Sequence, residues 1–396
     1  MPPAWWFVLL VGLLNHQPSI AEDVGAVQAT VPWAPQAVKG SDGRIHLAYE
    51  LRLTNPHADT GPVRLRHVAV LAEPGGAPLA KFDRAGVTGL LARPADASEQ
   101  HTGLSIEAGK SLVLLLWVDV PDPERPPTRL EHRLELETRE GQSTTVVASK
   151  VPVNPTPVPI FGPPLRGMRW LVAEGPGNRM SHHWGSLVPA NGLVTIPQRF
   201  AIDFFGLSPK GSAVRSARSE LAKSSNADWA GFGAEVLAVA DGIVRDAHDG
   251  ERDARPLKPL PEPRALTPRG LYGNYVILEV APGVFVHYAH LKNGSLKVHV
   301  GQRVLRGAVL GRLGHTGNAG AAHLHFHVSN SPTFEESEGL PYVFDAFDLL
   351  GSAKVEETLD KRANIRWPAA QSKSREMPLD GDVVLFGDRG TRDRAR

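Results

Sequence analysis

Residues 322–327 read Ala-His-Leu-His-Phe-His, with a histidine at every second position. In a β-strand, successive side chains point to opposite faces, so the three histidines would share one face and the two apolar residues the other. Neighbours on one face are close enough for one imidazole to bind a metal ion while the next handles a proton. The stretch therefore predicts a strand with His323 and His325 as candidate site residues. For His327 we expect only a place on a solvated part of that face.

Two further segments carry side chains suited to the same site. His290 lies in 286–291, Val-His-Tyr-Ala-His-Leu, where the chain leaves a predicted strand and a polar group can reach a neighbouring site. Asp203 lies in the apolar run 198–204, where a carboxylate is costly to bury unless it is paired or binds a metal. A salt bridge to Arg199 is the alternative explanation for Asp203. Together the histidines and the aspartate offer ligands for zinc, with imidazoles left over for proton transfer.

Period-two patterning extends through the N-terminal part of the chain. Hydrophobic and polar side chains alternate in 45–54 and again in 130–137, whereas 111–120 form one continuous apolar run. With 39 glycines and 34 prolines among 396 residues, the composition is typical of a turn-rich β protein. We therefore expect a mainly all-β chain that begins with an antiparallel, immunoglobulin-like β-sandwich over residues 22–151.

The remaining boundaries are predicted from composition. The apolar run 4–14 is too short to span a bilayer and suits the core of a signal peptide, so residues 1–21 are predicted to be one. A buried N-terminal strand or an uncleaved anchor is the alternative. Six prolines indicate an extended linker over 152–164. We expect a second antiparallel β-sheet domain over 165–348 and a charged C-terminal tail over 349–396.

Charge and cysteine content exclude several classes of function. The 43 basic and 42 acidic residues leave a net charge of +1, which gives no general electrostatic reason to bind nucleic acid or an anionic membrane. Because the chain has no cysteine, it can form neither disulfides nor cysteine-ligated metal centres. An exported chain without disulfides suits a bacterial envelope. We expect a periplasmic or extracellular protein with no membrane span once the signal peptide is cleaved.

Several short segments, taken in chain order, resemble the M23 (LytM/lysostaphin-type) zinc metallopeptidases. They are residues 233–244, 273–277, 288–291, 300–304, 314–317 and 323–326. The resemblance implies a small antiparallel sheet crossed by a groove, with Zn²⁺ as the cofactor. It further implies that Asp203 and His325 bind the zinc, and that His290 and His323 flank the water that attacks a peptide bond. The implied partners are peptidoglycan peptide stems or another peptide substrate.

One position departs from the family pattern. The family's first zinc ligand is a histidine four residues before the aspartate, whereas this chain has Arg199 there, and a guanidinium that stays protonated cannot ligate zinc. Either a histidine arrives from elsewhere or the domain has lost its metal. Residues 181–183, Ser-His-His, lie about 20 positions upstream of the aspartate, and a hairpin between the two segments can return His183 or His182 to Asp203. We expect His183 to be the relocated ligand.

Two functions follow from these observations. The first is a zinc-dependent endopeptidase that hydrolyses peptide bonds of bacterial peptidoglycan. The alternative is a metal-free LytM-like domain that binds cell wall or activates a separate hydrolase. Retention of the aspartate and three histidines favours the enzyme, and loss of the family's first histidine favours the binding domain. Two long polar stretches, 208–226 and 248–270, are of a length typical of lids or insertions.

Overall fold

The computed structural model describes residues 22–24, 27–56, 61–73, 76–92, 104–215, 221–258, 268–360 and 362–387. Within these residues nearly all regular structure is β, with mostly antiparallel pairing, so the predicted all-β class is confirmed. The α-helices described are α1 (Arg84–Thr88), α2 (His182–Gly185), α3 (Pro268–Tyr272) and α4 (Val355–Leu359). Each is far shorter than the roughly 20 apolar residues that a bilayer-spanning helix needs. The predicted signal peptide lies outside the described residues.

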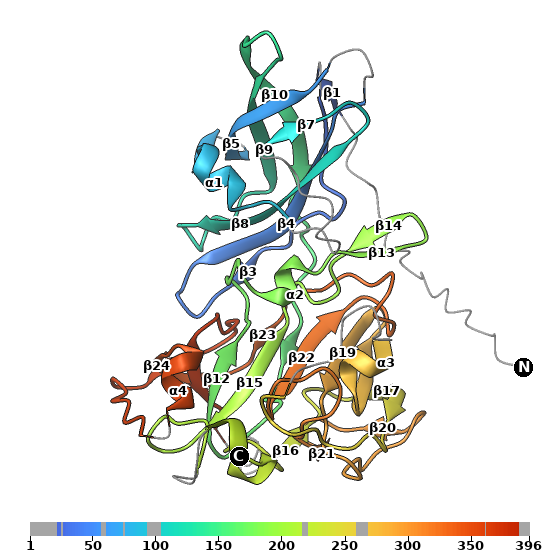
Figure 1. Cartoon of the computed structure of the whole chain (residues 1–396), viewed down its shortest axis with the longest axis vertical. Helices are drawn as coiled ribbons and strands as arrows, with labels where there is room; N and C mark the ends of the chain where they lie inside the picture. Colours follow the sequence, from blue (N-terminus) through green and yellow to red (C-terminus); the bar gives the residue numbers. More distant parts are fainter. Residues whose placement is uncertain are drawn as a thin grey trace, which may run out of the picture.

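Two five-stranded sheets form the N-terminal part of the molecule (Figure 1). The first has the order β1 (Glu22–Val24), β2 (Val27–Thr30), β4 (Ile45–Thr54), β3 (Val38–Lys39), with β8 (Ser111–Val120) also on β4. The second has the order β10 (Ser143–Pro152), β9 (Arg129–Glu137), β5 (Val63–Glu73), β6 (Ala77–Phe82), with β7 (Ser105–Ile106) on β5. Leu47, Leu51 and Leu134 are fully buried in one core that both sheets share. We call this unit the sandwich.

A ten-stranded sheet forms the second unit. Its order is β20 (Arg303–Val304), β17 (Gly242–His248), β18 (Tyr275–Ala281), β19 (Val284–Ala289), β22 (Leu324–Ser329), β15 (Ile202–Leu207), β12 (Arg169–Ala173), β26 (Asp382–Leu385), β24 (Phe347–Ser352), β25 (Gln371–Lys373). Short pairs accompany it: β11 (Ile160–Phe161) with β23 (Val343–Phe344), β13 (Val188–Ala190) with β14 (Leu193–Thr195), and β16 (Glu235–Leu237) with β21 (Val309–Arg312).

The histidine-rich strand lies in the middle of this sheet. β22 pairs antiparallel with β15 on one side and with β19 on the other, and the register sets His325 opposite Asp203 and Ala289. Leu324 and Phe326 lie in the apolar core of the second unit, and both are fully buried. The alternation in the sequence therefore turns the histidines of β22 to the opposite face of the sheet, beside the aspartate.

Residues 349–396 are not a separate tail where the structure describes them. β26 lies between β12 and β24, and its Val383 and Val384 are fully buried. This strand is only four residues long and contains three hydrophobic residues, a pattern too short to predict a strand from the sequence. The chain through Gly387 thus contributes strands to the second sheet.

Candidate metal centre

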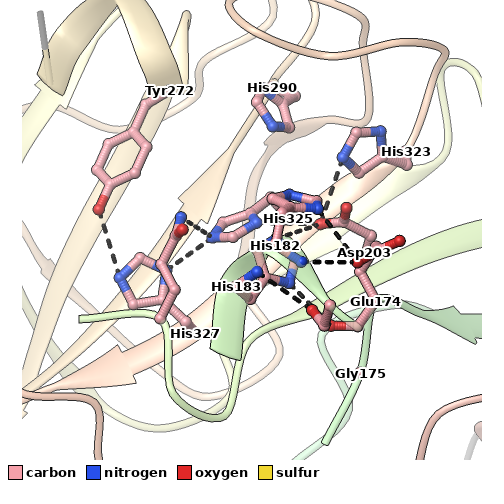
Figure 2. Close-up of polar contacts among 12 residues, drawn as sticks. Glu174, Gly175, His182, His183, Asp203, Tyr272, His290, His323, His325 and His327 are labelled. Carbon is pink, nitrogen blue, oxygen red and sulfur yellow. Dashed lines mark hydrogen bonds and ion pairs between the residues drawn. The ribbon is translucent and has the colours of Figure 1, made fainter. Parts of the chain in front are cut away.

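Three imidazole nitrogens surround one carboxylate oxygen on the polar face of the sheet (Figure 2). Asp203 Oδ1 is 3.0 Å from His325 Nδ1, 3.4 Å from His323 Nε2 and 3.5 Å from His183 Nε2. Bonds of about 2.0–2.1 Å in a tetrahedral zinc site separate the ligand atoms by about 3.3 Å. The distances from Asp203 Oδ1 to the His325 and His183 nitrogens are close to this spacing, so these donor types and distances are compatible with a zinc ion.

His183 reaches Asp203 from a helical turn outside the sheet. β12 ends beside Asp203, and the chain returns through α2, where the Ser181 hydroxyl accepts a hydrogen bond from the His183 amide and donates one to the Glu174 carbonyl. The His183 Nδ1–H donates to the same carbonyl at 2.9 Å. Because Nδ1 carries the proton, the lone pair of Nε2 is the one directed at Asp203. Ligand histidines in metal sites are commonly fixed in this way.

His182 and Arg199 are placed differently from His183. His182, His183 and Asp203 have ligand atoms within 4.8 Å of one another, but the His182 side chain is 65% exposed and its Nδ1 lies 3.2 Å from a Glu174 carboxylate oxygen. The structure therefore brings His183 into the buried group and leaves His182 at its surface. The alternative in which Asp203 pairs with Arg199 is wrong, because the guanidinium pairs with two glutamates instead.

His290 and His323 face each other beside the carboxylate, with ring centroids 4.7 Å apart. The Nδ1–H of His290 donates to the Thr316 carbonyl and that of His323 to the Ala321 carbonyl, both at 2.8 Å. Each ring therefore keeps Nε2 for other partners. His290 has φ +61°, a left-handed conformation that costs a residue with a Cβ about 1–3 kcal/mol and is concentrated at functional sites.

His327 is buried and does not face solvent, which corrects the expectation from the sequence. Its side chain is covered because the His287 ring stacks on it at 4.1 Å and Tyr272 of α3 lies against it. His327 Nδ1 is 2.9 Å from His325 Nε2, and its own Nε2 is 3.3 Å from the Tyr272 hydroxyl. A metal ion bound at His325 Nδ1 would leave the proton on Nε2, which would then donate to His327 Nδ1. The two-residue spacing was the sequence signal for this contact, whereas nothing in the sequence indicated Tyr272.

Burial and the single carboxylate set the protonation of the site. Burial lowers the pKa of His183 to about 3 and holds the pKa of His290 well below its ordinary value. Burial alone would raise the pKa of Asp203, but the imidazoles of His323 and His183 hold it well below the usual range. Burial alone would lower the pKa of His323, but Asp203 raises it. The site thus combines a neutral His183 and a neutral His290 with a readily protonated His323.

Residues 224–335 match the family model of peptidase family M23. This match confirms the resemblance to that family drawn from the sequence segments. The matched residues include His290, His323 and His325. His183 and Asp203 precede the match, so the structure rather than the family comparison joins them to the other three.

Solved structures with detectable similarity include three peptidases. The catalytic domain of EnpA from Enterococcus faecalis is 16% identical over 46% of this chain and 92% of that chain, with a TM-score of 0.25. The catalytic domain of lysostaphin from Staphylococcus simulans is 22% identical over 37% and 77%, with a TM-score of 0.20. A zinc-containing peptidase from Vibrio cholerae is 16% identical over 74% and 81%, with a TM-score of 0.25. TM-scores this low support no conclusion about this chain. No curated protein matches the sequence.

Proposed function

We propose that this chain is a zinc-dependent endopeptidase that hydrolyses peptide bonds of bacterial peptidoglycan. The M23 match supports a peptidase-type hydrolase. The observation that carries the zinc dependence is the approach of His183 Nε2 and His325 Nδ1 to the same oxygen of Asp203, at 3.5 and 3.0 Å. His183 thereby supplies the ligand that the Arg199 position lacks.

His183, Asp203 and His325 would hold the metal, and we call these three residues the zinc site. Three protein ligands are the number found in catalytic zinc centres, which keep a further position for solvent or substrate. Zinc bound there would lower the pKa of a water to about 7 and polarise the peptide carbonyl. In both ligand histidines the second nitrogen has its own hydrogen-bond partner, which fixes the ring and its tautomer.

His290 and His323 would move the protons of the reaction. His290 stays neutral, so its Nε2 can accept the proton that the attacking water gives up. The Nδ1–H of His323 is held by the Ala321 carbonyl, so its Nε2 is the nitrogen that can carry a proton to the nitrogen of the leaving amine.

The proposed substrate and location follow from the same family match. Peptide stems of peptidoglycan are the substrate class that we propose, and they place the protein in the periplasm or outside the cell. A metal-free domain that binds cell wall or activates a separate hydrolase is the second candidate. One observation favours it: Arg199 occupies the position of the family's first ligand and is engaged elsewhere.

Zinc content distinguishes the two candidates. The full-length chain, purified without added metal, is expected to carry one zinc per molecule and to release new amino groups from peptidoglycan. His183→Ala should abolish both properties, with zinc affinity reduced roughly 100-fold or more because a ligand is lost. His182→Ala is the matched control and should keep the metal. Substoichiometric zinc that His183→Ala leaves unchanged would instead establish the metal-free candidate.

A further inference from the structure

The ligand-bearing turn α2 is too short to hold its own conformation. It has four residues, and isolated helices of this length are not stable in water. Its beginning is fixed by two hydrogen bonds to Glu174: the Ser181 hydroxyl donates to the Glu174 carbonyl, and the His182 amide donates to the Glu174 carboxylate. Successive helical side chains point about 100° apart, so the Trp184 side chain leaves the turn in a different direction from that of His183. Whatever holds Trp184 also sets the position of His183.

The sandwich provides the surface against which Trp184 packs. Figure 1 shows α2 at the junction between the sandwich and the ten-stranded sheet. The Trp184 ring meets Trp117 of β8 edge-on, with ring centroids 6.2 Å apart and an angle of 87° between the planes. Ala48 and Leu115 of the sandwich belong to the same apolar cluster, and Trp184 is only 5% exposed.

Arg199 also lies over the Trp184 ring. The guanidinium carbon lies 5.5 Å from the Trp184 ring centroid, within the range of a cation–π contact. The same guanidinium is 2.7 Å from Glu50 of β4 and also pairs with Glu338. The side chains of Arg199 and of both glutamates are almost completely buried. An arginine that is buried to this extent needs carboxylate partners, and the sandwich supplies one of them.

We propose that the sandwich is a structural part of the metal centre, because Trp117 and Glu50 position His183 through Trp184 and Arg199. This proposal rests on the zinc site of the proposed function. Arg199 occupies the position of the family's first ligand, and in this chain it connects the two units instead of binding a metal. It also packs on Trp184 of α2, the turn that carries the proposed replacement ligand His183.

The test measures zinc affinity of the full-length chain by competition with a chelator. Trp117→Ala removes the ring that supports Trp184 without touching a ligand, and zinc affinity should fall about 10- to 100-fold, the range found for residues that orient metal ligands. Trp117→Phe keeps an aromatic edge and should restore most of the affinity. The visible spectrum of the Co²⁺-loaded protein should change in Trp117→Ala and return in Trp117→Phe.

A matched control separates positioning from general destabilisation. Leu134→Ala creates a cavity in the sandwich's own core, away from α2, and should lower thermal stability while leaving zinc affinity and the Co²⁺ spectrum unchanged. If Trp117→Ala folds poorly, Glu50→Gln tests the same anchor with a side chain of equal size and should also weaken zinc binding. Wild-type zinc affinity in both the Trp117 and Glu50 variants would overturn the proposal. Failure of the proposed function would show in the wild-type protein itself, as an absence of bound zinc.

Discussion

At the residue scale, each imidazole of the candidate metal centre is oriented by the group that binds its second nitrogen. In His183, His290 and His323 that nitrogen donates to a backbone carbonyl, which no side-chain substitution can remove. His325 differs, because its Nε2 faces the side chains of His327 and Gln198. A side-chain substitution can therefore change the orientation of the His325 ring, whereas it cannot remove the partners of the other three histidines.

Substitution of His327 should weaken metal binding although His327 is not a proposed ligand. His327→Ala leaves the His325 Nε2–H without its buried acceptor at 2.9 Å, and zinc affinity should fall about 10-fold or more. Chelator competition measures the change. Equal zinc affinity in wild type and His327→Ala would refute this role.

At the element scale, β15 carries Asp203, and its Gly206 is packed closely against the backbone at Gly231. A Cβ on Gly206 would lie 2.5 Å from the Gly231 Cα and 2.6 Å from its nitrogen, both backbone atoms that cannot rotate away. Gly206→Ala should therefore lower the free energy of unfolding by about 1–3 kcal/mol. Urea unfolding of the metal-free protein measures the change.

Gly320→Ala provides the control for this packing effect. A Cβ there meets nothing within 4 Å, so its effect should stay within about 0.5 kcal/mol. Equal stability of the Gly206 and Gly320 variants would show that the backbone at Gly231 can move away from β15, and that this close contact does not constrain the strand.

Strands with clear alternation were predictable from the sequence, and so was the approach of His325 to Asp203. The interpretation failed where a pattern was short or where the partner was remote in sequence. β26 has only four residues, and His327 has the residue type of a solvated position but is covered by Tyr272. Arg199 was recognised as a departure, but Glu50 is about 150 residues away and no local pattern connects the two.

At the scale of the whole molecule, the junction between the two units buries one guanidinium with two carboxyl groups. Burial raises the pKa of Glu338 to about 8, against the opposing effect of Arg199. Because the folded pKa lies above the ordinary value near 4.5, this group makes stability fall as the pH rises from about 4.5 to about 8. Below that window the carboxyl is protonated in both states, and above it the carboxyl is ionised in both.

Glu338→Gln should remove this contribution, since glutamine mimics the protonated carboxyl. The stability of the variant relative to wild type should therefore increase as the pH rises through the window, as measured by urea unfolding at pH 5 and pH 8. If the free energy of unfolding of the variant instead falls relative to wild type between pH 5 and pH 8, Glu338 is ionised beside Arg199.

The position of β26 has a practical consequence for anyone who isolates the region that matches the peptidase family model. The family match ends at residue 335, but β26 supplies the hydrogen-bonding neighbour of β12, and β12 in turn borders the strand that carries Asp203. A fragment cut where the match stops would present β12 as a bare edge, and bare edges recruit strands from other molecules. Such a fragment would be prone to aggregate, and its inactivity would reveal nothing about the chemistry of the intact chain.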